Sequence, residues 1–268
     1  METFQLHRGT APLLVSLPHN GSFIPVDITE RMHPLAQVSP DSDWHVDLLY
    51  DFAIGLGASV IKPLASRYVV DLNRPADGHA LYPGRTETGL VPTMMFDGAP
   101  IYRDGEAVGP DETAARVNQY WRPYHTALAS EIARMRDVHE RIVLWEGHSI
   151  RAVVPMLFEG RLPDLNLGTA DGVSCDPSLQ ASLATQLEGQ DRYTHVVNGR
   201  FKGGYITRAY GNPGQGVHAV QLELAQVNYM DEKTFAYDEI KAAGLKKILH
   251  PLLQACIGFA QAAAGASQ

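Results

Sequence analysis

The sequence is poor in cysteine and in basic residues, and each shortage excludes a class of protein. Of 268 residues only Cys175 and Cys256 are cysteines, too few for a disulfide framework and wrongly spaced for a zinc-thiolate site. The 30 acidic residues outnumber the 22 basic ones, which gives a formal net charge of −8. A protein that grips phosphate backbones is normally basic, so the sequence does not predict a nucleic-acid partner.

Long apolar segments are also missing. No run reaches the roughly 20 apolar residues that a membrane-spanning helix needs. The first ten residues, METFQLHRGT, contain no apolar stretch of the kind found in signal peptides. The hydrophobic content of 45% is nevertheless enough for a sizeable core. We therefore expect a soluble, cytoplasmic protein without membrane contact, and its oligomeric state stays open.

Three common catalytic motifs are absent. The chain contains no HExxH zinc helix, no GxSxG serine turn and no phosphate-binding loop that ends in GK[ST]. Candidate catalytic residues must therefore be identified from where polar residues lie relative to the predicted strands.

Short apolar runs alternate with helical patterns along the chain, which is typical of an α/β sheet. The predicted strands are Pro12–Leu17, Ala58–Pro63, Arg67–Leu72, Arg141–Trp145 and His218–Leu224. The predicted helices are Asp41–Gly55, Pro110–His139, Ser178–Leu187 and Asp238–Ala263, with breaks or bends expected at Pro123 and Pro251. We expect one domain over residues 1–268, with a mostly parallel sheet flanked by helices in three layers. Residues 75–109 are crowded with Gly, Pro, Asp and Thr, so we expect a long irregular loop there.

Polar residues follow several of these strands. His19 comes just after LLVSL, Asn73 and Arg74 just after RYVVDL, and His148 just after RIVLWE, whereas Glu223 lies within AVQLELAQ. Ligands of open α/β sheets bind beyond the carboxyl ends of the strands. The sequence therefore predicts that these side chains converge at one edge of the sheet.

His19 and His148 are candidate metal ligands, because imidazole is the commonest protein ligand of metals. A catalytic zinc takes three protein ligands and leaves one position open. Asp43 or Asp47 could be the third ligand, and they would share a face if a helix has started. The alternative is that both histidines are ordinary turn residues.

Glu223 is a candidate general base, because a carboxylate among apolar neighbours is costly unless it has a partner. Gln221 on the same face slightly favours the alternative, a strand with a solvent-exposed side. Arg74 and Arg208 can each recognise a carboxylate through a bidentate fork. Either arginine could instead form a structural ion pair, with Asp71 as its natural partner.

Taken together, several segments resemble the N-formylglutamate amidohydrolase (N-formylglutamate deformylase) family. The resemblance covers nearly the whole chain in consistent order. It rests on LVSLPHNG (14–21), DSDWHVDLLYDF (41–52), SRYVVDLNRP (66–75), LWEGHSI (144–150), NGRFKGGYITRAYG (198–211) and VQLELAQVNYMDE (220–232).

The resemblance implies a phosphorylase/hydrolase-like α/β fold, akin to that of zinc-dependent exopeptidases. It also implies a divalent metal, expected to be zinc, and hydrolysis of N-formyl-L-glutamate to formate and L-glutamate in histidine degradation. Two alternatives remain open: a deacylase of another N-acyl amino acid or short peptide, and a non-catalytic protein that binds an acidic metabolite.

The resemblance also assigns roles to residues of this chain. A metal-activated water would attack the formyl carbon, with Glu223 as general base. Apart from the resemblance, our mechanistic hypothesis is that Tyr205 or Arg208 stabilises the oxyanion, with the choice between them open. The family pattern leads us to expect Asp where this chain has Glu146, so the partner of the neighbouring histidine is open. The resemblance makes His19, Asp43 and His148 the metal ligands, with Asp47 as second choice for the acid, and Asn73 and Arg74 the substrate ligands. From the charge of the substrate and the proposed mechanism, we also expect Arg208 and Tyr205 to contact the substrate.

Overall fold

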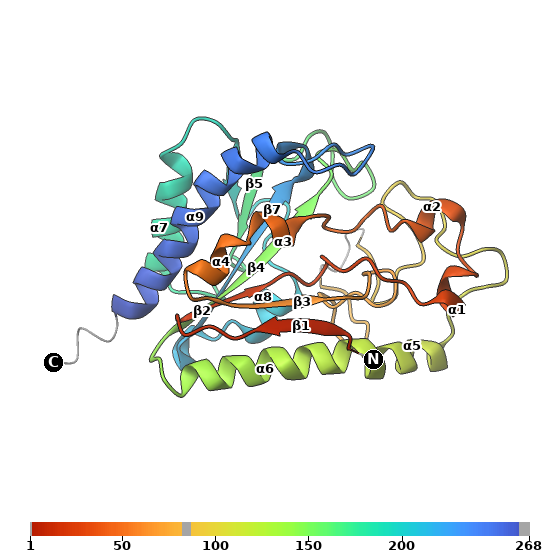
Figure 1. Ribbon diagram of the computed structural model, residues 1–268, viewed down its shortest axis with the longest axis horizontal. Helices are drawn as coiled ribbons and strands as arrows, with labels where there is room; N and C mark the ends of the chain where they lie inside the picture. The colour runs from red at the N-terminus through yellow and green to blue at the C-terminus, as the bar shows by residue number, and fades with distance from the viewer. Residues whose placement is uncertain (1, 82–86, 263–268) are drawn as a thin grey trace.

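The computed structural model describes residues 2–81 and 87–262, which form a seven-stranded sheet with helices on both faces (Figure 1). The strands are β1 (Phe4–His7), β2 (Leu13–Ser16), β3 (Ser59–Pro63), β4 (Ile142–Ile150), β5 (Leu165–Gly168), β6 (His195–Val197) and β7 (Val217–Ala225). The α-helices are α1 (Val26–Thr29), α2 (Pro34–Gln37), α3 (Val46–Leu49), α4 (Phe52–Gly55), α5 (Pro110–Arg116), α6 (Arg122–Arg136), α7 (Pro177–Glu188), α8 (Tyr205–Tyr210) and α9 (Glu239–Ala262). A π-helical turn, η1 (Val117–Trp121), separates α5 from α6, and two 3₁₀ turns are η2 (Pro213–Gln215) and η3 (Gln226–Asn228).

The sheet is mostly parallel, as the sequence predicts. Its strand order is β1-β3-β2-β4-β7-β5-β6. The pairs β2–β3, β2–β4, β4–β7 and β5–β6 are parallel, and β1–β3 and β5–β7 are antiparallel. The central strands β4 and β7 are buried along their whole length, because helices cover both of their faces.

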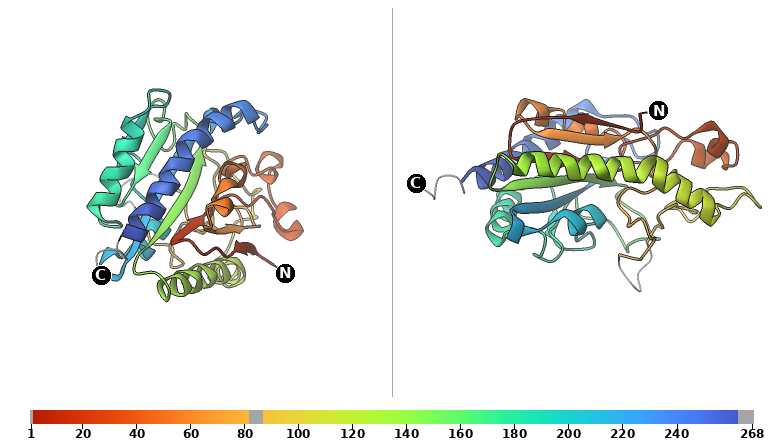
Figure 2. Two further views of the ribbon diagram at one scale, coloured as in Figure 1. Left: turned by 60° about the vertical axis from the view of Figure 1, so that its left-hand side comes forward. Right: turned by 90° about the horizontal axis from the view of Figure 1, so that it is seen from below.

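Side chains alternate between two apolar layers along the central strands. Val143 and Trp145 of β4 join the layer beneath α3, α4, α7 and α9, whereas Ile142 and Leu144 join the layer beneath α6, η1 and α8. Figure 2 shows α9 and α7 on one side of the sheet and α6 on the other. Because successive side chains of a strand point to opposite faces, each central strand contributes to both apolar layers.

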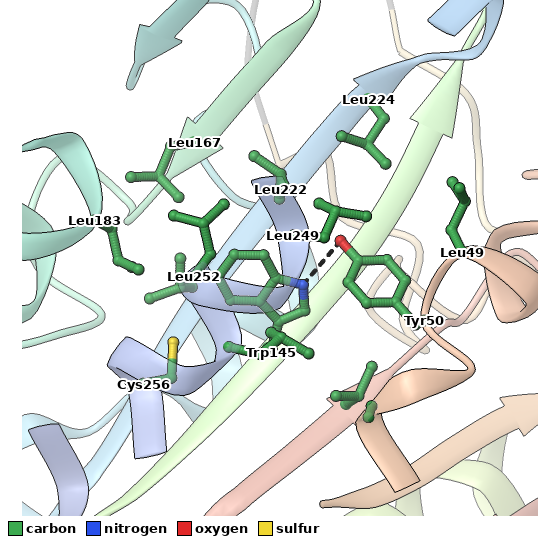
Figure 3. Packing of buried hydrophobic residues seen from close by; sticks show 14 of the residues in the cluster. Leu49, Tyr50, Trp145, Leu167, Leu183, Leu222, Leu224, Leu249, Leu252 and Cys256 are labelled. Atoms are coloured by element: carbon green, nitrogen blue, oxygen red, sulfur yellow. Dashed lines mark hydrogen bonds between the residues drawn. The ribbon is translucent and has the colours of Figure 1, made fainter. Parts of the chain in front are cut away.

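Trp145 and Tyr50 lie at the centre of the first layer, with exposed fractions of 0% and 1% (Figure 3). The indole Nε1 of Trp145 donates to the Tyr50 hydroxyl over 3.0 Å, so a buried donor has a partner. Leu222 and Leu249 pack around the pair. Each such fully buried apolar side chain contributes about 1.5–3 kcal/mol.

One predicted strand is wrong. Residues 67–72 form turns, and the guanidinium Nη2 of Arg67 binds Asp71 Oδ2 at 2.8 Å. In an extended strand, residues four apart lie about 13 Å from each other, so this ion pair requires a turn. The edge strands β1 and β6 and the neighbouring short strand β5 carry no long apolar run, and the sequence does not predict them.

The predicted helices agree with the structure more closely than the predicted strand at residues 67–72. Ser178–Leu187 matches α7, and Asp238–Ala263 matches α9, although Ala263 lies outside the described residues. The predicted break near Pro123 is confirmed, because η1 interrupts the helix just before it. Proline lacks the N–H that an α-helix needs at that position. Of the predicted helix Asp41–Gly55, only the short α3 and α4 form.

The predicted irregular region of residues 75–109 contains no helix and only isolated β-bridges among the described residues 75–81 and 87–109. Residues 82–86 of that region lie outside the described part of the chain. Within the described ranges, the structure has no helix long and apolar enough to cross a membrane.

Candidate active site

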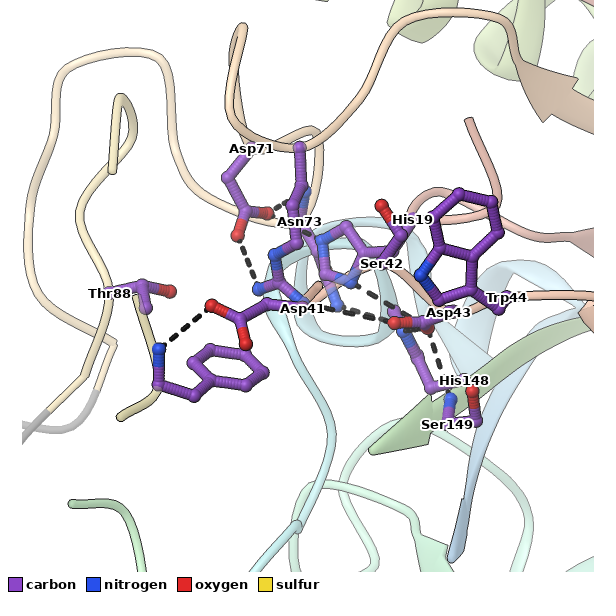
Figure 4. A network of polar contacts seen from close by, with 12 residues as sticks. His19, Asp41, Ser42, Asp43, Trp44, Asp71, Asn73, Thr88, His148 and Ser149 are labelled. Carbon is purple, nitrogen blue, oxygen red and sulfur yellow. Dashed lines mark hydrogen bonds and ion pairs between the residues drawn. The ribbon is translucent and has the colours of Figure 1, made fainter. Parts of the chain in front are cut away.

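Three predicted metal-ligand side chains meet at the carboxyl ends of the central strands. His19 follows β2, His148 lies in β4, and the backbone N–H of Asp43 donates to the His19 carbonyl over 3.0 Å. One potential ligand atom from each of these three buried residues lies within 4.8 Å of the others (Figure 4). The convergence expected from the strand ends is therefore present.

The donor set suits a divalent cation. Asp43 Oδ2 lies 2.9 Å from His148 Nδ1 and 3.8 Å from His19 Nδ1. Asp43 Oδ1 is buried and has no hydrogen-bond partner among the described residues, with the Arg67 guanidinium 3.8 Å away. A buried carboxylate oxygen without a hydrogen bond is costly. Two imidazoles and a carboxylate are a common set for zinc and related metals. A cation shared by the three residues would satisfy that oxygen.

Each histidine has a carboxylate behind it. Asp71 Oδ1 lies 2.7 Å from His19 Nε2, and Glu146 Oε1 lies 2.8 Å from His148 Nε2. Such carboxylates hold the ring of a metal-binding histidine in place and leave its other nitrogen for the metal. Glu146 therefore stands where an aspartate was expected, and its longer side chain reaches the histidine two residues along the same strand.

The surrounding charges act on the two imidazoles in opposite directions. Burial and the nearby Arg67 cation lower the pKa of His19. Burial also disfavours charge on His148, but its hydrogen bonds to Asp43 and Glu146 outweigh that effect and raise its pKa well above the usual value. The two carboxylates that flank His148 therefore favour positive charge at this position, and a metal cation would meet the same electrostatic setting.

Glu223 stands beside this cluster. It pairs in register with His148 across β4 and β7, and 7% of its surface is exposed. Burial, together with the charges of Asp43 and Glu146, raises its pKa to about 8 against the opposing effect of His148. The alternative of a solvent-facing strand is wrong, because Gln221 is also buried and accepts from a backbone N–H over 2.7 Å.

Asn73 supports the cluster from a third side. Its Nδ2 lies 3.0 Å from His148 Nε2, and its Oδ1 accepts the backbone N–H of Ile206 over 2.9 Å. Glu146 likewise accepts the backbone N–H of Thr207 over 3.0 Å. The first turn of α8 therefore helps to hold two side chains that contact His148.

A cleft of about 600 Å³, counted with its open mouth, lies over the cluster. It contains three arginines, Arg67, Arg74 and Arg200, and an apolar wall. The cleft thus combines positive charge with a potential metal site. Its lining consists of His19, Arg67, Asn73, Arg74, Glu87, Thr88, Phe96, His148, Ser149, Ile150, Leu157, Arg200, Phe201, Gly204, Gln221 and Glu223.

Two of these arginines are absent from the sequence predictions. Arg67 is buried, lies 3.8 Å from Asp43 Oδ1 and stacks over the Phe96 ring at 5.1 Å. Arg200 donates from Nε to the Leu157 carbonyl over 2.7 Å. The four-residue spacing of Arg67 and Asp71 was the available signal for the first, but the predicted strand concealed it.

Other candidates lie elsewhere. Asp47 binds Lys62 at 2.5 Å and is partly exposed, so it does not join the histidines. Arg208 donates from Nε to the Gly203 carbonyl over 2.9 Å, and Tyr205 packs near Trp121. Among the described residues, neither Tyr205 nor Arg208 lines the cleft, and their roles stay predictions.

The irregular region contributes one wall of the cleft. The backbone N–H of Phe96 donates to Asp41 Oδ2 over 2.8 Å, and Arg151 binds the other oxygen of that carboxylate at 2.8 Å. Arg74 donates to the Thr88 carbonyl over 2.7 Å (Figure 4 includes Asp41 and Thr88). The loop is therefore attached to the site from both sides.

With this geometry in view, comparison with known proteins is informative. The family model of N-formylglutamate amidohydrolase matches residues 11–230. The chain belongs to that family. It is 48% identical over 259 residues to N-formylglutamate deformylase of Pseudomonas aeruginosa and 46% identical to that of Pseudomonas putida. Each alignment covers 96% of this chain and 97% of the relative. The chain is therefore an enzyme of the amidohydrolase type.

Solved structures agree with the family assignment. N-formylglutamate amidohydrolase from Ralstonia eutropha superposes with a TM-score of 0.84 at 26% identity, covering 98% of this chain and all of the other. A gene product of Agrobacterium tumefaciens superposes with a TM-score of 0.72 at 18% identity over 99% of this chain and 97% of the other. The second likeness concerns the fold alone.

Proposed function

We propose that this amidohydrolase hydrolyses N-formyl-L-glutamate to formate and L-glutamate with the help of one bound divalent cation, most suitably zinc. The observation that carries the proposal is the buried group of His19, Asp43 and His148 beside Glu223, at the floor of an arginine-lined cleft. The names of the two Pseudomonas relatives support the choice of substrate.

His19, Asp43 and His148 would hold the cation through the two Nδ1 atoms and the carboxylate. A divalent cation in such a site polarises a carbonyl oxygen and makes water more acidic. Asp71 and Glu146 would keep the two imidazole rings in the orientation that this requires, because each already binds the opposite ring nitrogen.

Glu223 is the proposed general base. It takes a proton from the water that adds to the formyl carbon and returns the proton to the leaving amine as the carbon–nitrogen bond breaks. A carboxyl group with a pKa raised to about 8 can accept and return a proton near neutral pH. Burial of Glu223 beside the cluster places this exchange away from bulk water.

The glutamate part of the substrate carries two carboxylates, and arginine binds carboxylates through two parallel hydrogen bonds. Arg74 and Arg200 are the proposed partners, since both line the cleft. The substrate carboxylate would replace contacts that Arg74 makes with Thr88 and with the Asn73 carbonyl. Their charge would also attract a dianion to a protein whose net charge is −8. Contacts of Tyr205 or Arg208 with the substrate stay predictions, as does a role in histidine degradation.

The test is release of formate by the purified protein from N-formyl-L-glutamate, compared with N-acetyl-L-glutamate, N-formyl-L-glutamine and a formyl-dipeptide. Clear preference for N-formyl-L-glutamate supports the proposal. Faster hydrolysis of an acetylated or peptide substrate would contradict it and favour the broader deacylase alternative.

A further inference from the structure

Residues 67–74 supply several side chains to the site without forming a strand or a helix. Arg67, Asn73 and Arg74 line the cleft, and Asp71 binds His19. Such a segment lacks the hydrogen bonds that a sheet ladder would give its backbone, so its buried carbonyls need other donors.

The first donor is Arg116 at the end of α5. Its guanidinium Nη1 donates to the Val69 carbonyl over 3.1 Å and contacts the Tyr68 carbonyl at 3.4 Å. Arg116 is almost completely buried, with 3% of its surface exposed. A charged side chain buried to this extent against a neighbouring turn holds the backbone of that turn in place.

Two further donors come from η1 and α6, which together with α5 form one continuous helical rod. Trp121 donates from Nε1 to the Arg74 carbonyl over 2.9 Å, and His125 donates from Nε2 to the Leu72 carbonyl over 2.9 Å. The two rings stack at a centroid distance of 3.7 Å. The helical rod therefore binds the backbone of this segment, while site side chains of the segment extend toward the cleft.

His125 is fixed as a neutral donor. Burial lowers its pKa to about 4, against the opposing effect of the Leu72 carbonyl. Because Nε2 carries the proton, Nδ1 accepts from the Tyr210 hydroxyl over 2.9 Å. The ring cannot rotate without losing both hydrogen bonds.

The π-helical turn η1 explains how one helical rod supplies both Arg116 and Trp121. Residues five apart in an α-helix differ by about 140° around the axis, whereas a π-turn pairs residue i with i+5. The turn over Val117–Trp121 therefore brings Arg116 and Trp121 to the same side of the helical rod, where both donate to carbonyls of the segment 67–74.

We propose that Trp121, His125 and Arg116 are positioning residues that orient Arg74, Asn73 and Asp71 by binding the carbonyls of residues 68–74. The proposal rests on the function given above, and it assigns to η1 the role of aligning these donors. Trp121 would act mainly on substrate binding through Arg74, and His125 mainly on turnover through Asn73 and Asp71.

The test is Trp121→Phe, which keeps a ring for stacking and removes one donor. Loss of one such hydrogen bond predicts a rise of about fivefold in KM for N-formyl-L-glutamate, with kcat changed less than about twofold. Amide hydrogen exchange at residues 68–74 should be faster in this variant. Tyr124→Phe is the matched control, since its hydroxyl on the same helix binds Ser16 instead, and it should change neither KM nor that exchange.

A second pair of variants tests the donor role without depending on Trp121. His125→Gln keeps an N–H for the Leu72 carbonyl, whereas His125→Phe has none, so kcat should fall further in the second. Wild-type protein without activity on N-formyl-L-glutamate would refute the function alone, because the exchange experiment still tests the positioning role. Unchanged exchange at residues 68–74 in both Trp121→Phe and His125→Phe would overturn the inference.

Discussion

At the scale of single residues, the candidate site consists of titratable side chains that are buried close to one another. Asp43, His148 and Glu223 are all almost completely buried, and charged groups taken from water must find partners. The Asp43 carboxylate has one oxygen on His148 and the other without a hydrogen bond. The second oxygen faces the Arg67 guanidinium at 3.8 Å, beyond hydrogen-bond distance, and a bound cation would satisfy it.

Glu223→Gln tests the general base. The amide has the same shape but cannot take a proton, so kcat should fall by about 10²–10⁴ while KM and metal content stay near the wild-type values. Steady-state kinetics with metal analysis of the same sample measures both. Turnover equal to wild type would remove Glu223 from this role.

Arg74→Ala tests carboxylate recognition. A charge-assisted bidentate pair contributes about 1.5–3 kcal/mol, so KM for N-formyl-L-glutamate should rise at least tenfold, by the relation of about 1.4 kcal/mol per factor of ten. A substrate that lacks the bound carboxylate should be affected far less. An equal rise for charged and uncharged substrates would assign Arg74 to the structure of the loop at Thr88 instead.

At the scale of elements, the site depends on how closely α8 approaches the residues after β3. A Cβ on Gly204 would lie 2.2 Å from Asn73 Nδ2, closer than any side chain can sit. Gly204 can therefore be replaced only if Asn73 moves away from His148. The absence of a side chain at Gly204 permits this close approach.

Gly204→Ala should consequently lower kcat/KM by more than tenfold, since loss of one oriented group in a catalytic site costs about 1.4 kcal/mol or more. Gly258→Ala is the matched control, because nothing lies within 4 Å of its added Cβ. That control lies in α9 and should raise the free energy of unfolding by about 0.5–1 kcal/mol. Normal kinetics in Gly204→Ala would contradict the packing argument.

At the scale of the whole molecule, the potential metal ligands come from distant parts of the chain, at positions 19, 43 and 148. The unfolded chain cannot hold them together, so a bound cation stabilises only the folded state. Metal affinity and thermal stability should therefore change together.

Chelation should abolish formate release and lower Tm, and zinc should restore both. Asp43→Asn should bind less metal and lose the chelator-dependent change in Tm. Asp47→Asn is the matched control, because that carboxylate pairs with Lys62 away from the cluster. Full activity in a metal-free sample would exclude the proposed ligand set.

His125 should make stability depend on pH. Its pKa of about 4 lies below the unfolded value of 6.5, so the unfolded chain binds its proton first. The free energy of unfolding contributed by this group is complete above pH 6.5 and declines as the pH falls toward 4, by about 3 kcal/mol at most. His125→Gln should have a shallower loss of stability over that range in denaturant titrations. An identical slope would show that His125 is not held neutral.

The sequence alone determined the features that depend on local pattern. Alternating apolar runs predicted β2, β3, β4 and β7, and these strands carry or lead into His19, His148 and Glu223. The family resemblance, confirmed by the family model, came from ordered short motifs of the same strands and their turns. Side chains alternate regularly along a strand, so the local sequence is enough to predict which residues lie at its end.

Only the tertiary structure decided the features that depend on contacts between distant segments. It separated Asp43 from Asp47, brought Arg67 and Arg200 into the cleft, and left Arg208 outside the lining among the described residues. The local sequence of residues 67–72 predicts a strand because its Tyr-Val-Val run is apolar. Its conformation is set by ion pairs and by donors from a helix more than forty residues away. The periodicity of a sequence indicates which side chains point toward the core. The partner of a side chain is decided only when distant segments come together in the folded chain.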